Sequence, residues 1–242
     1  YPKGESNVVD NLSLTIPQGK KVAFVGHSGS GKTTVTKLLL RAYAYTDGSI
    51  KIGNFELKDI NADSLRQSIG YVEQHVDLFD DTIKNNILFG VDEKVLNKWA
   101  KSKEVDSKLE EVAKLARIDE FYNRLGEKKF ETEIGERGIK LSGGERQRIG
   151  IARAIIKDPS ILVFDEATSA LDTVNEQYIK EAIDNVSRGR TTIIIAHRLS
   201  TIRGADKIFV LDHGQLVGEG KHEELMQTCS IYRDLVEHQE LM

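Results

Sequence analysis

Short apolar runs that end in polar or glycine residues are the clearest pattern along this chain. Four runs are rich in β-branched residues: "KVAFVG" ends at Gly26, "SIGYVEQ" at Gln74, "SILVFDE" at Asp165 and Glu166, and "TTIIIAH" at His197. Continuous apolar runs of this length predict strands that are buried on both faces, as in a parallel sheet covered by helices. Helical patterns lie between them, in "GKTTVTKLLLRAY" and "NEQYIKEAIDNV", so the alternation predicts an α/β fold.

Two segments depart from this alternation. In "KIFVLDHGQLVGEG" the turn residues Asp-His-Gly at 212–214 separate two strand-like halves, which predicts a hairpin. Residues 92–133 are rich in Lys and Glu and predict a mainly helical insert, with Trp99 packed beneath it. Within the insert, Asp106 and Ser107 are expected to cap a helix. The apolar face of that helix would contain Leu109, Val112, Ala113 and Ala116.

Composition narrows the class of protein. The 242 residues are 30% charged and 39% hydrophobic, which is typical of one globular domain, and no run approaches the ~18 apolar residues of a membrane span. The net charge of −4 argues against nucleic acid as a partner, so any affinity for phosphate must be local. The single cysteine, Cys229, fits a reducing cytosol. A chain that begins at Tyr1 rather than methionine is expected to be part of a longer protein.

The segment "GHSGSGKT" satisfies G-x-x-x-x-G-K-[ST], with a predicted strand before it and a predicted helix after it. Glycines allow successive backbone N–H groups to point at phosphates, Lys32 reaches the β- and γ-phosphate oxygens, and the Thr33 hydroxyl can ligate Mg²⁺. The alternative is a chance glycine-rich turn, which the flanking strand and helix disfavour. The motif therefore predicts a nucleoside triphosphate site. Its cradle would comprise Gly26, His27, Ser28, Gly29, Ser30, Gly31, Lys32 and Thr33.

Polar residues at the ends of the other three runs should join this cradle, because ligands bind beyond the carboxyl ends of parallel strands. We expect Asp165 to hold Mg²⁺ and Glu166 to orient or deprotonate an attacking water. Gln74 and His197 have alternatives: Gln74 could be an ordinary polar residue at a strand end, and His197 could cap a backbone group. A carboxylate pair after a buried strand is harder to explain without a metal.

A second glycine motif lies in "LSGGERQRIG". Ser142 and Glu145 have the spacing of a capping box at a helix N-terminus. Two glycines after the cap indicate that backbone N–H groups approach something closely there, and a helix N-terminus attracts anions. The residues alone leave open whose anion this would be, since the chain already has one phosphate cradle.

With the P-loop, "LSGGERQR", "ILVFDEATSALD" and "IIIAHRLS" in this order, the chain resembles the ATP-binding cassette (ABC) family over essentially its whole length. The resemblance implies a P-loop NTPase core with a mainly parallel sheet, an antiparallel β subdomain and an inserted helical subdomain. It implies one ABC ATP-binding domain over residues 1–242, with the core at approximately 1–75 and 156–242 and the helical subdomain at approximately 76–155.

The resemblance also implies a partner. In ABC proteins two cassettes pack head to tail, so Ser142, Gly143 and Gly144 of one chain would bind the ATP held by Lys32 of the other, in a homodimer or a heterodimer. "SALD", residues 169–172, looks like the loop that crosses the interface between the two cassettes.

Four single positions resemble family site residues. Tyr1 resembles the aromatic residue that stacks on adenine, and Thr34 would contact the α-phosphate. Gln74 resembles the glutamine that touches Mg²⁺ and water and links the site to the membrane partner. His197 resembles the switch histidine on the γ-phosphate.

Three segments resemble exporters in particular: "TEIGERGIKLSGGERQR", "LFDDTIKNNILFG" and "AHRLSTIRGADKIFVLDHGQLVGEGKHEEL". The expected function is ATP hydrolysis that powers export, at the cytosolic face of a membrane, with a transmembrane domain fused N-terminally. An importer ATPase subunit is the nearest alternative. A regulatory cassette that only holds ATP is disfavoured because Glu166 and His197 are both present. A soluble ABC ATPase of translation or DNA repair would carry coiled-coil inserts or two cassettes.

Two remaining features concern packing. The tail "HEELMQTCSIYRDLVEHQELM" predicts an amphipathic helix that includes Leu225, Ile231 and Leu235 and packs on its own domain. "RQRIGIARA" has Gly150 where alanine is common in the family, which is expected to alter stability slightly.

Overall fold

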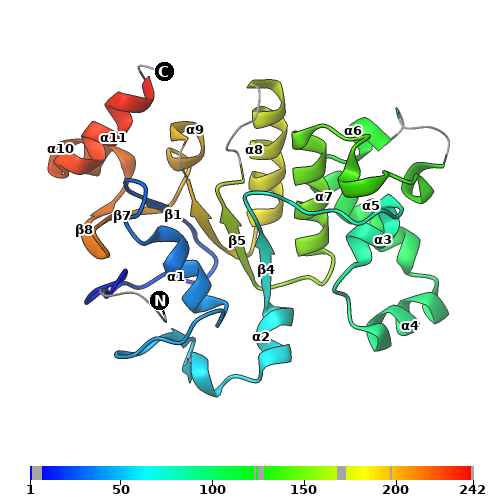
Figure 1. Ribbon diagram of the computed structural model, residues 1–242, viewed down its shortest axis with the longest axis horizontal. Coiled ribbons are helices and arrows are strands. Elements are labelled where there is room, and N and C mark those ends of the chain that lie inside the picture. Colours follow the sequence, from blue (N-terminus) through cyan, green and yellow to red (C-terminus); the bar gives the residue numbers. More distant parts are fainter. Residues whose placement is uncertain (2–6, 123, 125–127, 168–172, 197, 241–242) are drawn as a thin grey trace.

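A six-stranded sheet forms the centre of the computed structural model, which describes residues 1, 7–122, 124, 128–167, 173–196 and 198–240 (Figure 1). Its strands run in the order β4-β5-β6-β1-β7-β8, with parallel pairing from β4 to β7 and an antiparallel pair between β7 and β8. The predicted α/β class is therefore confirmed. The strands are β1 (Lys21–Val25), β4 (Ile69–Val72), β5 (Ile161–Asp165), β6 (Thr191–Ile195), β7 (Lys207–Asp212) and β8 (Gln215–Gly220).

Both faces of the sheet are buried, as the continuous apolar runs predict. In β1, Ala23 and Val25 join one apolar cluster, whereas Val22 and Phe24 join another on the opposite face. The first cluster includes residues of α7, α8, α10 and α11, and the second includes residues of α1 and α2. The helices of these clusters are α1 (Lys32–Leu39), α2 (Ala62–Ser68), α7 (Gly143–Ile155), α8 (Thr173–Ser187), α10 (His222–Thr228) and α11 (Ser230–Glu240).

The strand order brings the predicted site residues together. β4, β5, β6 and β1 are four consecutive neighbours, and they are the four strands expected to lead to Gln74, to Asp165 and Glu166, to His197 and to the P-loop. Because these strands are parallel, their carboxyl ends lie at the same edge of the sheet. His197 itself lies outside the described residues. The predicted convergence of strand ends is thus confirmed for the P-loop, β4 and β5.

Two antiparallel pairs accompany the parallel sheet. β7 and β8 form the hairpin predicted around residues 212–214, and they pair from Ile208 with Gly220 to Asp212 with Gln215. A separate two-stranded sheet consists of β2 (Lys51–Ile52) and β3 (Phe55–Glu56). Of the helices in the described part of the chain, none combines the length and apolar character needed to cross a bilayer.

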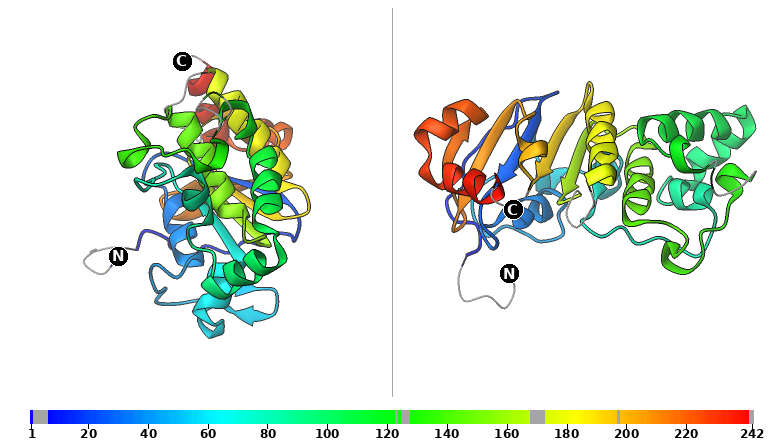
Figure 2. Two further views of the ribbon diagram at one scale, coloured as in Figure 1. Left: turned by 90° about the vertical axis from the view of Figure 1, so that its right-hand side faces the viewer. Right: turned by 90° about the horizontal axis from the view of Figure 1, so that it is seen from above.

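The helices between β4 and α7 lie at one end of the sheet, and the C-terminal helices lie at the other (Figure 2). Trp99 and the predicted face of α5 are buried in the main cluster. The expected cap was wrong: α5 begins before Asp106, because α4 ends at left-handed Lys103 and Glu104 opens the next turn, with its N–H bonded to the carbonyl of Trp99. The helices of this region are α3 (Ile83–Leu88), α4 (Glu93–Ser102), α5 (Val105–Leu115) and α6 (Asp119–Tyr122).

The tail forms two helices where one was expected. α10 ends at Cys229, which has extended backbone angles, and α11 starts at the next residue. Cys229 is buried under β8, where a Cβ on Gly218 would lie 3.1 Å from its Sγ. The break in the helical pattern thus coincides with a residue that is packed against the hairpin.

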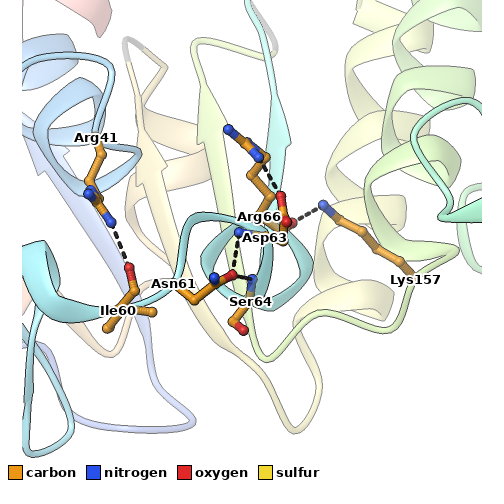
Figure 3. Close-up of polar contacts among 7 residues, drawn as sticks. All are labelled: Arg41, Ile60, Asn61, Asp63, Ser64, Arg66 and Lys157. Atoms are coloured by element: carbon orange, nitrogen blue, oxygen red, sulfur yellow. Dashed lines mark hydrogen bonds and ion pairs between the residues drawn. The ribbon is translucent and has the colours of Figure 1, made fainter.

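Polar contacts fix α2, which precedes β4 (Figure 3). The side chain of Asn61 caps the helix by accepting from the N–H groups of Asp63 at 2.9 Å and Ser64 at 3.2 Å. Arg66 pairs with Asp63 on the exposed face, and Lys157 donates to the carbonyl of Arg66. Since α2 leads directly into β4, these contacts also set the position of β4 beside β5.

Candidate functional site

The loop between β1 and α1 has a backbone that requires glycine at two positions. Gly31 caps α1 with a φ of +101°, a left-handed conformation that L-residues rarely adopt. A Cβ on Gly26 would lie 2.1 Å from the carbonyl oxygen of Leu211 in β7. His27, Ser28 and Gly29 are exposed, and Ser30 is buried. The loop thus turns tightly against the sheet and presents its outer residues to solvent.

Lys32 is buried at the base of this loop, with 4% of its surface exposed. Its Nζ donates to the carbonyl oxygens of Gly26 at 2.8 Å and His27 at 2.9 Å. Burial lowers the pKa of Lys32, and the nearby carboxylates of Glu166 and Asp165 partly oppose that shift. The two carbonyls hold the ammonium group inside the loop, where it could contact a bound phosphate.

Thr33 and Asp165 meet across the sheet edge. The Thr33 hydroxyl donates to Oδ1 of Asp165 at 3.3 Å, and the Tyr71 hydroxyl donates to Oδ2 at 2.9 Å. Asp165 is 6% exposed, and burial raises its pKa, with a further contribution from Glu166. Hydroxyl and carboxylate oxygens are the ligands that Mg²⁺ prefers. A divalent cation would also relieve the cost of the buried carboxylate, so this donor set fits Mg²⁺.

Glu166 follows β5 in an uncommon backbone conformation. Its φ is +52°, and its N–H bonds to the carbonyl of Ile195 in β6 at 3.0 Å. A left-handed conformation in a residue other than glycine costs about 1–3 kcal/mol and occurs often at functional sites. The bond to β6 therefore holds the Glu166 backbone at the end of β5, next to Asp165.

Gln74 lies two residues beyond the end of β4 and is exposed. The segment that carries it is tied to α7, because the side chain amide of Gln147 donates to the carbonyl of Glu73 at 2.9 Å. Gln147 is buried, with 5% of its surface exposed. This bond connects the Gln74 segment directly to the helix that begins at the "LSGG" motif.

Tyr1 lies beside the start of α1. Its hydroxyl is 2.9 Å from Oγ1 of Thr34, and its ring contacts that of Tyr43 edge to face, with centroids 4.8 Å apart. Tyr1 is 48% exposed, so an open aromatic surface stands next to the P-loop helix. This position is compatible with the expected stacking on a base.

The N-terminus of α7 carries the capping box that the sequence predicts. The N–H of Glu145 donates to the Ser142 hydroxyl at 3.3 Å, and Glu145 Oε2 accepts from the N–H of Ser142 at 2.7 Å. Burial alone would raise the pKa of Glu145, but this backbone N–H and the guanidinium of Arg124 outweigh it and lower the pKa. Ser142 and Gly143 are exposed, whereas Gly144 is buried.

The two motifs predicted to bind phosphate occupy different parts of the molecule. Figure 1 shows α1 and α7 on either side of strands β5 and β4. The structure thus gathers Lys32, Thr33, Asp165 and Glu166 at one sheet edge and does not bring Ser142 and Gly143 into their contacts. His197 and residues 169–172 lie outside the described part of the chain.

Two contributors to the site were not predicted from the sequence. Tyr71 holds Asp165, and Arg124 pairs with Glu145, the residue that follows the LSGG segment (residues 141–144, hereafter the signature). The first depends on the pairing of Tyr71 in β4 with Val163 in β5, a register that periodicity does not reveal. The second joins residues that are 21 positions apart in irregular sequence.

Comparisons with known proteins agree with this geometry. The model of the ABC transporter family matches residues 9–169. The chain is 46% identical over 237 residues to an ATP-dependent lipid A-core flippase of Legionella pneumophila, covering 97% of this chain and 38% of the flippase. It is 46% identical over 242 residues to the leptomycin B resistance protein pmd1 of Schizosaccharomyces pombe, covering 100% of this chain and 18% of that protein.

Among solved structures, a bacterial Atm1-family ABC exporter with ATP bound superposes with a TM-score of 0.83 at 41% identity. The match covers 98% of this chain and 40% of that one. The chain therefore spans about two fifths of the length of the exporter and of the flippase.

Proposed function

This chain belongs to the ABC transporter family, and from that premise we propose that it is the ATP-hydrolysing cassette of a membrane exporter, working as a head-to-tail pair. The names of its relatives, a lipid flippase and multidrug exporters, favour export over import. A transmembrane portion in the same protein is part of this proposal, since the chain matches 38% to 40% of those bacterial relatives. That portion would hold the cassette at the cytosolic face of a membrane.

The observation that carries the proposal is the joining of Lys32, Thr33 and Asp165 at one sheet edge, away from α7. Lys32 would bind the β- and γ-phosphate oxygens of ATP, and Thr33 and Asp165 would hold Mg²⁺. A cation held by these residues would supply charge neutralisation for phosphoryl transfer. Tyr71 keeps the Asp165 carboxylate facing Thr33 through its own hydrogen bond.

Glu166 would orient the attacking water and accept its proton, since its backbone is held next to Asp165. Gln74 and His197 would complete the polar surroundings of the γ-phosphate. Ser142 and Gly143 are exposed at the start of α7, and Figure 1 shows α7 apart from α1, so they would serve the ATP of a second cassette. The reaction on one chain then depends on residues of another.

The test is Glu166→Gln. We expect this variant to bind ATP with unchanged affinity, to release no phosphate, and to accumulate as an ATP-bound dimer in size-exclusion chromatography. Glu237→Gln, on the exposed face of α11, is the matched control and should hydrolyse ATP at the wild-type rate. Unchanged phosphate release by Glu166→Gln would remove Glu166 from its role.

A further inference from the structure

Gly144 differs from the two signature residues before it, because it is buried against α8. A Cβ built on Gly144 would lie 2.5 Å from Oδ1, 2.6 Å from Cγ and 2.7 Å from Cβ of Asn175. Unstrained carbon–carbon contacts lie at about 3.5–4.0 Å. No side chain fits at position 144 unless one of the two helices moves.

The close approach includes an atom of Asn175 that side-chain rotation cannot move. Rotation about χ1 would move Oδ1 and Cγ of Asn175, but its Cβ is fixed by the backbone of α8. Gly144 is the second residue of α7 and Asn175 the third of α8, so the two helices touch near their first turns. One turn further along α7, the buried guanidinium of Arg148 lies over the ring of Tyr178 in α8, 5.1 Å from its centroid.

The backbone of Gly144 gives no other reason for glycine. Its φ is not among the positive values, and it lies inside a regular helix. Alanine is favoured over glycine there by about 1 kcal/mol of intrinsic helix propensity. The contact with Asn175 is therefore the feature of this chain that requires a residue without a side chain.

We propose that Asn175 is a positioning residue for the signature: its contact with Gly144 sets the distance between the first turns of α7 and α8, and so the place where Ser142 and Gly143 meet a second cassette. The missing side chain of Gly144 then leaves room for Asn175 within the chain, and the Gly144 backbone stays free to face a partner's nucleotide. This inference rests on the proposed function, because the position of α7 matters for catalysis only if the signature acts on a partner's ATP.

The experiment is a rescue series in the full chain. Gly144→Ala should bind ATP at its own P-loop with unchanged affinity and lose ATP hydrolysis, on the order of 10²-fold for a displacement of ~1 Å. Adding Asn175→Gly removes the opposing Cβ and should restore most of the rate. Adding Asn175→Ala should not, because the Cβ remains. The matched control is Gly150→Ala, another buried glycine of α7, whose added Cβ would meet Val76 instead of α8; Asn175→Gly should not rescue it.

Unfolding of the nucleotide-free protein tests the contact without catalysis. The loss of stability caused by Gly144→Ala should shrink or reverse sign in the Asn175→Gly background and persist in the Asn175→Ala background. If Gly144→Ala does not fold, folding of the double variant with Asn175→Gly supports the proposal, and failure of both overturns it. Wild-type hydrolysis by Gly144→Ala also overturns it, as does a folded, ATP-binding double variant that stays inactive. Failure of the proposed function would instead appear as absence of hydrolysis in the wild type.

Discussion

Replacing Tyr71 with phenylalanine removes one hydroxyl, whose partner is the buried carboxylate of Asp165. That carboxylate is 6% exposed, so water cannot readily replace the donor. Among the described residues, the remaining side-chain donor is Thr33 at 3.3 Å, a longer bond than the 2.9 Å of Tyr71. A hydrogen bond to a charged group contributes about 1.5–3 kcal/mol. For 242 residues this loss lowers the midpoint of thermal unfolding by roughly 3–6 °C.

Urea unfolding at pH 7 measures this loss, and an Asp165→Asn background is the control. A neutral pair of the same geometry is about half as strong, so Tyr71→Phe should cost roughly 1 kcal/mol in that background. The cost should also shrink in acid, because the contribution of the Tyr71 bond is largest while Asp165 is ionised. Equal losses in the two backgrounds, or a loss below about 0.5 kcal/mol in the wild type, would refute the assignment of Tyr71 as the partner that holds Asp165.

Three further predictions concern charged side chains. Burial raises the pKa of Asp165, so stability falls as the pH rises through its folded-state pKa. Asp165→Asn should therefore raise the melting temperature of the nucleotide-free protein at neutral pH, by an amount that shrinks in acid. In the same thermal scan, this variant should lose the Mg²⁺-dependent stabilisation by ATP. The pKa of Glu145 is lowered, so its ionised form stabilises the fold at neutral pH, and this contribution is lost as the pH falls through the folded-state pKa. Urea unfolding of Glu145→Gln should therefore show a deficit in stability at pH 7 that disappears in acid. Arg153 donates to the main-chain and side-chain oxygens of fully buried Asn86, at 2.8 and 3.1 Å. Arg153→Ala should lower the free energy of unfolding in urea by about 3 kcal/mol. Arg153→Lys should recover only part of this loss, because lysine lacks the planar guanidinium group.

The parts of the fold that follow from local pattern were predictable from the sequence. β1, β5 and β6 coincide with apolar runs rich in branched residues, because burial on both faces favours apolar side chains along most of each strand. The P-loop and the capping box at Ser142 are also local, since each depends on residues within one turn of chain. Gathering of the strand ends followed from one rule of parallel sheets, without knowledge of the strand order.

Features that depend on contacts between distant segments were not predictable. Tyr71 reaches Asp165 only through the β4–β5 register, and Asn175 covers Gly144 only because α7 and α8 pack side by side. The tail pattern is helical throughout, yet the chain divides it at Cys229, whose backbone is extended. Gly150 has a similar cause, because a Cβ there would lie 2.6 Å from Cγ2 of Val76.

The central claim, a nucleotide site completed by a second chain, is tested most directly by mixing two inactive variants. Lys32→Ala disables the P-loop and leaves the signature intact, whereas Ser142→Arg blocks the signature and leaves the P-loop intact. A mixed head-to-tail pair contains one intact site, formed by the P-loop of the second variant and the signature of the first. Mixing equal amounts should therefore restore phosphate release to about a quarter of the wild-type rate, because half of the pairs are mixed and each has one working site of two. Mixtures no more active than either variant alone would contradict the shared site.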